Sequence, residues 1–392
     1  MNLQEKNFIS LLRASVLPGL VPQLEEPNYD EILSIAERHA ITGLLYPGLK
    51  KCLSPQDPLL SQMKKRSFGA ATCASIRKKE LGKIYDLCNN RKIPILPLKG
   101  CVIKELYPYP ELRTMSDADL LIPPDGRSGI RKGLEDLGFR FHKVDAADTD
   151  VYISPLSLNY EIHLDMTEEG FSPKSREFCS RLSELSTPTE EGSFVMVLPP
   201  EEHYIYILCH FIKHFIYGGI GIRQLTDLYI CYRNWGLDLQ KVRDLLEVLE
   251  LSSFHNNLKA LWEHWFLEAP ATDTTEALGS YILHSGVFGN EEQRATDRLL
   301  SAEQKGNYIF TRLFPPYRVM KGYFPILRKL PFLLPFAWIW RALRAVLFRR
   351  KKLTTEFNAM SSTDADALNS KRQFYRHCGL SVYDKTSDES MK

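Results

Sequence analysis

The sequence predicts an α+β protein in which a small mixed sheet backed by helices is flanked by helical regions at its N- and C-terminal sides. Apolar residues recur at three- and four-residue spacing over residues 1–90 and again from residue 199, as on one face of an amphipathic helix. Between these regions, short apolar runs end at turn residues, which is typical of strands. The 392 residues suffice for two or three domains with a cleft between them.

Composition and cysteine usage narrow the class of protein. Asp and Glu number 48 against 50 Lys and Arg, so there is no overall basic field and no strong nucleic-acid signal. The eight cysteines form no CxxC pair and no zinc-ligand spacing, and residues 1–19 lack the layout of a signal peptide. We therefore expect a reduced, cytoplasmic protein.

The N-terminal region, residues 1–90, is expected to be a helical scaffold. Its apolar spacing predicts helices over 7–17, 29–49 and 58–91, separated by turns that contain Pro and Gly. The pattern changes at the apolar run 93–98, which Lys99-Gly100 stops, as at a buried strand that enters a helix.

A mixed α/β unit is expected over residues 91–198. After the first strand, we expect a helix at 101–107, a strand at 117–122, a helix at 126–138 and strands at 139–144, 150–155 and 158–166. A helix flanked by strands predicts a small mixed sheet backed by helices.

Residues 199–352 are expected to form a second helical domain, followed by a polar tail at 353–392. The expected helices are 203–217, 222–235, 238–249 and 255–266, and Pro200 with two glutamates suits a first helical turn. The tail is too polar to form a core, apart from residues 370–380.

Residues 331–352 combine aromatic and basic residues. The apolar run Pro331 to Trp340 is about half the ~20 residues that a membrane helix needs and contains two prolines, so it does not span a bilayer. The basic residues that follow suit a helix that caps the core with a solvated face; peripheral contact with an anionic membrane or with a partner is the alternative.

Carboxylates on two predicted strands indicate a metal site. Asp117 and Asp119 lie two residues apart, so both project from the same face of a strand. Two carboxylates at such a short distance repel each other unless a cation lies between them. Hard oxygen ligands suit Mg²⁺ or Mn²⁺. Alternation in the later strand places Glu161, His163 and Asp165 on one face, from which a third carboxylate can reach the same ions.

Lys99 and Gly100 at the strand-to-helix junction predict a phosphate site. Free backbone N–H groups at a helix start attract anions, glycine allows close approach and lysine adds a charge. Together with carboxylates that hold two metal ions, these parts suit in-line attack of a hydroxyl on a nucleoside triphosphate such as ATP.

The segments "LKG", "LYPYPELRTMSDADLLI" and "EIH" resemble the motifs of the uncharacterised nucleotidyltransferase family, within the polymerase-β-type superfamily. The resemblance covers about residues 90–235, including the helical stretch with histidines and Asp227. It implies a polymerase-β-like catalytic domain at 91–198. The commoner phosphate loop of the superfamily has two glycines and a serine, where this chain has Lys99-Gly100-Cys101.

The resemblance also implies roles for individual residues. Asp117 and Asp119 would hold both metal ions, and Glu161 would complete the site for the ion that activates the acceptor hydroxyl. Lys99 and Gly100 would receive the triphosphate, with Arg113 as a second phosphate contact. The implied reaction transfers a nucleoside monophosphate to the hydroxyl of an unidentified acceptor and releases pyrophosphate.

Several of these side chains have simpler explanations. Arg113 suits a loop ion pair with Glu111, and Asp227 suits an ion pair with Arg223 four residues earlier on a helix. His163 is a candidate for orienting a ligand or the acceptor, but a histidine in a strand is as often structural. His203, His210 and His214 share one helical face, where packing is the simpler expectation and lining the cleft or binding a transition metal is the alternative. With Asp227, His210 and His214 are candidates for the substrate cleft.

Two other functions stay open at this stage. A nucleotide-sugar glycosyltransferase also uses D-x-D to hold Mn²⁺, but it would need a βαβ domain before the motif, where this chain is expected to be helical. A non-catalytic nucleotide-binding regulatory protein of the same fold is the second alternative. The sequence indicates neither the base, nor the acceptor, nor the oligomeric state.

Overall fold

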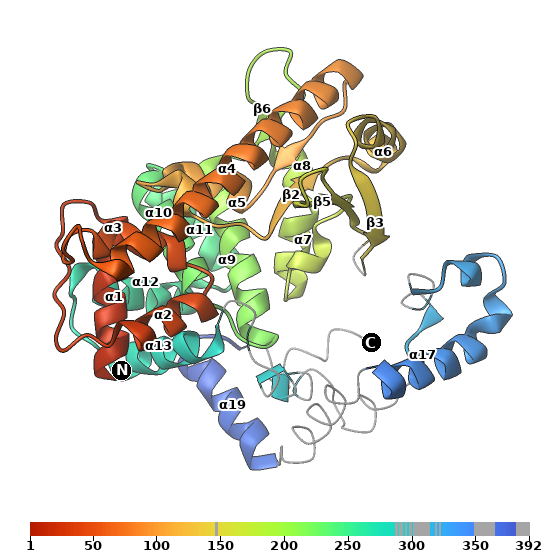
Figure 1. The fold of residues 1–392 in the computed structure, drawn as a ribbon. Coiled ribbons are helices and arrows are strands. Elements are labelled where there is room, and N and C mark those ends of the chain that lie inside the picture. Colours follow the sequence, from red (N-terminus) through yellow and green to blue (C-terminus); the bar gives the residue numbers. More distant parts are fainter. Residues whose placement is uncertain are drawn as a thin grey trace.

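The computed structural model describes residues 1–145, 148–286, 314–317, 323–348 and 365–381, with isolated residues between 289 and 320. Figure 1 shows a sheet-containing unit beside a larger assembly of helices. The expected helix-rich α/β architecture with a small mixed sheet is confirmed.

The central sheet has five strands in the order β1-β2-β5-β4-β3. Their bounds are Leu96–Pro97 (β1), Asp117–Leu121 (β2), Arg140–Val144 (β3), Asp150–Ile153 (β4) and Asn159–His163 (β5). The pairing of β2 with β5 is parallel, whereas β1 with β2, β5 with β4 and β4 with β3 are antiparallel. Two strands distant in sequence thus lie side by side at the centre.

Two helices cover one face of this sheet. They are α4 (Pro58–Arg91), the long orange helix of Figure 1, and α6 (Arg127–Asp136). Their apolar side chains share a core with the inward residues of β2, Ala118 and Leu120. Because side chains alternate along a strand, Asp117 and Asp119 project from the opposite face of the sheet.

The N-terminal helices differ from the expectation at two places: the first helix begins at Leu3 rather than at residue 7, and the second is broken. α1 spans Leu3–Val16, but the helix expected over 29–49 is wrong as a single element, because it breaks into α2 (Tyr29–Arg38), a 3₁₀ turn η1 (Thr42–Leu45) and α3 (Tyr46–Leu49). Ala40 takes a positive φ of 54°, which ends a right-handed helix.

The strand expected over 158–166 is also too long, because β5 ends at His163. Asp165 instead accepts hydrogen bonds from the backbone N–H and hydroxyl of Thr167, at 3.0 and 2.7 Å, and so starts a turn. Its expected place on the face of Glu161 is therefore wrong. The helix expected at 101–107 divides into α5 (Gly100–Ile103) and the 3₁₀ turn η2 (Lys104–Leu106).

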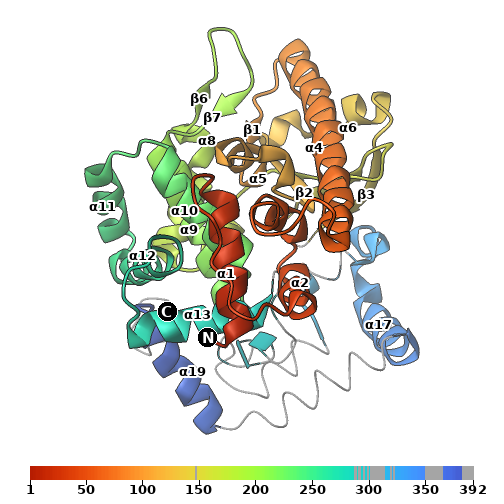
Figure 2. The same ribbon diagram turned by 60° about the vertical axis from the view of Figure 1, so that its left-hand side comes forward.

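A group of helices follows the sheet. They are α9 (Pro200–Ile216), α10 (Ile222–Asn234), α11 (Leu239–Val248), α12 (Ser252–Leu267) and α13 (Asp273–Ser285). Figure 2 shows α9 and α10 side by side, with α11 and α12 along one flank.

Short elements connect the longer helices and strands. They are η3 (Pro110–Leu112), η4 (Pro124–Gly126), η5 (Thr167–Glu169), α7 (Pro173–Ser180), α8 (Leu182–Leu185), and the paired strands β6 (Thr187–Pro188) and β7 (Met196–Val197).

The two described C-terminal helices differ in how they pack against the main core. α17 (Leu334–Phe348) leaves Phe336 and Trp340 exposed, and its described apolar side chains that are buried belong to a small cluster separate from the main core. The expectation that 331–352 caps the main core is therefore wrong over its described part. Contact of α17 with a membrane or partner stays a prediction, and residues 349–352 lie outside the described residues. α19 (Ala365–His377) buries Tyr375 against the core. None of the described helices is long and apolar enough to cross a membrane.

Candidate active site

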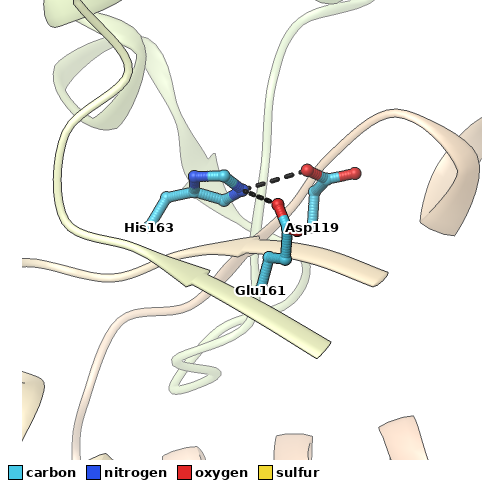
Figure 3. A group of neighbouring side chains, drawn as sticks. All are labelled: Asp119, Glu161 and His163. Atoms are coloured by element: carbon cyan, nitrogen blue, oxygen red, sulfur yellow. Dashed lines mark hydrogen bonds and ion pairs between the residues drawn. The ribbon is translucent and has the colours of Figure 1, made fainter. Parts of the chain in front are cut away.

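Asp119 and Glu161 lie next to each other across the parallel pair β2 and β5. The register places Asp119 opposite Glu161, and Leu121 opposite His163. Figure 3 shows the side chains of Asp119, Glu161 and His163 pointing toward one another. One ligand atom from each of the three lies within 4.8 Å of the other two. The strand register therefore brings two carboxylates that are distant in sequence to one point.

His163 orients Asp119. Its Nε2 lies 3.0 Å from Oδ1 of Asp119, and its Nδ1 lies 3.0 Å from the hydroxyl of Thr149. A carboxylate can only accept a hydrogen bond, so Nε2 of His163 carries a proton and donates to Asp119. With Nε2 protonated, His163 positions a carboxylate and is not free to ligate a cation through that atom.

Lys99 is held against the same carboxylate by a strained backbone. It takes φ 50° and ψ −125°, a conformation that L residues rarely adopt. Its ammonium donates to Oδ1 of Asp119 at 2.9 Å and lies 3.8 Å from Glu169. The turn before α5 thus places the Lys99 ammonium next to the carboxylate of Asp119.

The carboxylates differ in their proton affinity. Burial alone would raise the pKa of Asp119, but Lys99 and His163 outweigh burial and hold it well below its ordinary value. Burial, followed by the charges of Asp119 and Asp117, raises the pKa of Glu161. The site therefore contains a permanently charged carboxylate beside one that holds its proton more strongly.

Glu169 is the main residue of the site that the sequence analysis missed. It follows β5 in η5, accepts a hydrogen bond from His210, and lies 3.2 Å from the ammonium of Lys213 and 3.8 Å from Lys99. Burial would raise the pKa of Glu169, but Lys99 and then His210 lower it well below its ordinary value. The acidic pair in "TEEG" just after the EIH segment was the available signal.

Arg113 forms a buried ion pair with α10. Its Nε and Nη2 donate to Asp227 at 3.1 and 2.6 Å, and the hydroxyl of Tyr107 donates to the same carboxylate at 2.8 Å. The expected pairs of Arg113 with Glu111 and of Asp227 with Arg223 are therefore wrong. A Cβ at Gly100 would collide with the guanidinium of Arg113, which explains the glycine there.

These residues line one cavity of about 290 Å³, which we call the carboxylate cavity. Its walls bring together nearly all of the candidate residues from the sequence: Lys99, Gly100, Arg113, Asp117, Asp119, Glu161, His210, His214 and Asp227. His163 supports it through Asp119, whereas His203 is buried against Trp235 and does not line it.

The donor set of the carboxylate cavity fits a hard divalent cation. Asp117, Asp119 and Glu161 supply only carboxylate oxygens, the ligands that Mg²⁺ and Mn²⁺ prefer. Burial, and then the charges of Asp119 and Asp117, disfavour the charged form of Glu161, and a cation bound there would stabilise it.

Comparisons with known proteins show the family to which the chain belongs. No curated protein matches the chain. Among solved structures, the antibiotic-resistance factor ANT(2'')-Ia shares 16% identity and a TM-score of 0.33, over 48% of this chain and 97% of that chain, a likeness too low to support an argument. The family model described as "uncharacterised nucleotidyltransferase" matches residues 25–267, well over half of the chain. The protein therefore belongs to the uncharacterised nucleotidyltransferase family.

Proposed function

We propose that the protein is a metal-dependent nucleotidyltransferase with a polymerase-β-like catalytic domain at 91–198. It transfers a nucleoside monophosphate from a nucleoside triphosphate to an acceptor hydroxyl. The acceptor oxygen bonds to the α-phosphorus, the bond from that phosphorus to the pyrophosphate leaving group breaks, and the hydroxyl proton is released. The observation that carries the proposal is the in-register pair Asp119 and Glu161 on β2 and β5.

Asp117, Asp119 and Glu161 are the residues proposed to hold two Mg²⁺ or Mn²⁺ ions. When bound, such ions neutralise charge on the triphosphate and activate the acceptor hydroxyl. A bound cation would favour the charged form of each carboxylate and so would oppose the effects that raise the pKa of Glu161. His163 keeps the Asp119 carboxylate in place through its Nε2 hydrogen bond.

The phosphate side of the site is assigned to Lys99 and Gly100. Lys99 supplies the point charge, and Gly100, without a Cβ, allows close approach to the backbone. Arg113 uses Nε and Nη2 on Asp227, so it can reach a phosphate only through Nη1, which is bound to the carbonyl of Thr114 at 3.3 Å. We therefore assign Arg113 a weaker phosphate contact than Lys99.

Two neighbouring residues on α10 present polar atoms for a ligand. Nε of Arg223 and Oε1 of Gln224 are buried without a hydrogen-bond partner among the described residues, and both side chains line the carboxylate cavity. A buried polar atom without a partner is costly unless a ligand or water satisfies it. We assign them to the nucleotide or the acceptor.

The glycosyltransferase alternative gains no support. The chain before the D-x-D segment contains the helices α1, α2, α3 and α4 and only the short β1, which is no βαβ nucleotide domain. It would also leave Glu161, which lies opposite Asp119, without a role.

Label transfer tests the proposal. Purified protein is incubated with each α-labelled nucleoside triphosphate, Mg²⁺ or Mn²⁺ and a cytosolic extract, beside the double variant Asp117→Ala/Asp119→Ala. Label that moves to an acceptor only with the wild type, together with pyrophosphate release, would support the proposal. Absence of both transfer and metal-dependent nucleotide binding would refute it; binding without transfer would favour a regulatory protein.

A further inference from the structure

A second cavity adjoins the carboxylate cavity and is lined by cations. It has a volume of about 410 Å³ and lies between α4, η1 and the segment before β2. Its charged lining residues are Arg66, Arg77, Lys104 and Arg113, and all the residues that line it belong to the described part of the chain, without an Asp or Glu among them. We call it the basic cavity.

Two of these cations lack a close carboxylate partner. Arg77 is buried and donates to the carbonyls of Asn159 and Met115, each at 3.4 Å, and none of its hydrogen bonds within the described residues goes to a carboxylate. Lys104 is 5% exposed, and its ion pair is with Glu105 at 3.8 Å, outside the cavity lining. Burying a cation without a close anion is unfavourable, so this pair predicts an anionic ligand.

The other two cations are already paired. Arg66 forms an ion pair with Glu37, and Arg113 pairs with Asp227. Burial lowers the pKa of Lys104; the charge of Glu105 opposes this shift, and the charge of Arg77 adds to it. Arg77 and Lys104 are therefore the two cations of the cavity without a close carboxylate among the described residues.

Small residues line the basic cavity together with these cations. They are Gly43, Gly69, Ala70 and Ala74. Such a surface accepts an oxyanion by charge-assisted hydrogen bonds to Arg and Lys.

The basic cavity lies close to the candidate chemistry. Arg113 and Met115 line both cavities. Met115 precedes Asp117 by two residues, so their Cα atoms are at most about 7 Å apart. A small molecule with its anionic group in the basic cavity can therefore direct a hydroxyl toward the carboxylates.

We infer that the basic cavity binds an oxyanion group of the acceptor, a phosphate or a carboxylate, and so selects anionic acceptors. The inference rests on the proposed nucleotidyl transfer for its acceptor role. The cations that would make the contact are Arg77 and Lys104, with Arg66 at the exposed side.

Binding is tested by calorimetry without nucleotide or divalent cation, using ribose 5-phosphate, ribonate and uncharged ribose as probes. The phosphate and carboxylate probes distinguish the two oxyanions, and ribose controls for the sugar. We expect at least one charged probe to bind about tenfold or more tightly than ribose, the effect of one hydrogen bond to a charged group. Equal affinity for all three probes would overturn the inference.

Variants assign the binding to the cavity. Lys104→Gln and, separately, Arg66→Gln should weaken binding of the charged probe, Lys104→Gln by about tenfold. Lys65→Gln is the control, because Lys65 is an exposed residue of α4 that does not line the cavity. Thermal melting verifies that each variant is folded. Unchanged binding in Lys104→Gln and Arg66→Gln would overturn the inference.

A separate measurement distinguishes this inference from the proposed function. Metal-dependent binding of a non-hydrolysable nucleoside triphosphate should be the same in Lys104→Gln and wild type. Weakened nucleotide binding in Lys104→Gln would assign the cavity to the triphosphate and overturn the inference. Absence of nucleotide binding in the wild type, with intact binding of the charged probe, would overturn the proposed function and with it the acceptor role, but not the oxyanion site.

Discussion

The ammonium of Lys99 lies 2.9 Å from Oδ1 of Asp119, the same oxygen that accepts a hydrogen bond from His163. In the protein alone, Lys99 is thus the counter-ion of a carboxylate proposed to hold a divalent cation. Lys99 is also the residue proposed to meet the triphosphate. When metal and nucleotide bind, the ammonium of Lys99 must therefore leave Asp119 to contact the triphosphate.

Replacing Lys99 by Met should have opposite effects on metal and nucleotide. The variant has no ammonium beside Asp119 to compete with a metal ion. Mn²⁺ should therefore bind more tightly in the absence of nucleotide, by about tenfold if the change in binding free energy is ~1.4 kcal/mol. Transfer from the triphosphate should fall by at least the same factor. Metal titration and initial rates measure the two quantities.

Lys213→Met is the matched control for this prediction. Lys213 also contacts Glu169, at 3.2 Å, and lines the carboxylate cavity, but it forms no ion pair with Asp119. The Mn²⁺ affinity of the Lys213→Met variant should stay near that of the wild type. Weaker Mn²⁺ binding in Lys99→Met would contradict the counter-ion role.

The buried pair of Arg113 and Asp227 should be costly to break from one side. Asp227→Asn leaves the guanidinium buried without its counter-charge, and we expect a loss of about 3–5 kcal/mol in the free energy of unfolding. The double variant Arg113→Met/Asp227→Leu should recover part of this loss, because neither charge is then left alone. Urea denaturation measures the free energy of unfolding of the wild type, the single variant and the double variant.

An exposed pair supplies the comparison. Arg131 and Glu135 lie 3.3 Å apart on α6 and are about half exposed. Glu135→Gln should change the free energy of unfolding by no more than about 0.5 kcal/mol. A similarly small effect for Asp227→Asn would show that the buried pair does not hold α10 against the segment before β2.

Buried neutral histidines should make stability depend on pH. Burial lowers the pKa of His39 and His255 to about 4 and that of His203 to about 3. Above about pH 7 these histidines are neutral whether the chain is folded or not. As the pH falls below 6.5, the unfolded chain binds protons that the folded chain does not, so stability decreases by up to about 1.4 kcal/mol per pH unit for each histidine.

His39→Gln checks this prediction between pH 7.5 and 5.5. Nδ1 of His39 accepts from the backbone N–H of Ile222 at 3.2 Å, and Nε2 contacts the carbonyl of Leu283 at 3.1 Å. Glutamine retains hydrogen-bonding groups but does not titrate, so the variant should be less stable at pH 7.5 and should lose less stability on acidification. An equal slope in both proteins would rule out His39 as a contributor.

Alternation along β2 predicted correctly which of its side chains face the core. Ala118 and Leu120 face the core while Asp117 and Asp119 face away, as period two requires. Alternation also placed Glu161 on the correct face of its strand, but the register that sets it opposite Asp119 is fixed by pairing between segments forty residues apart.

Long-range contacts explain what the sequence did not predict. Glu111 is close to Arg113 in sequence, and Arg223 is close to Asp227. Arg113 instead pairs with Asp227, 114 positions away. Glu169 joins Lys99 and His210 only because η5 packs beside α9. Local spacing contains no information on such pairs, and the break at Ala40 depends on backbone geometry rather than on apolar period.

The central claim is that Asp119 and Glu161 hold a divalent cation together. The most direct test is electron paramagnetic resonance of Mn²⁺ in the presence of a non-hydrolysable nucleoside triphosphate. Asp119→Asn and Glu161→Gln should each weaken Mn²⁺ binding by at least about tenfold, whereas Asp125→Asn, which changes an exposed carboxylate in η4, should bind as the wild type does. Mn²⁺ binding that is unchanged in both site variants would contradict the claim.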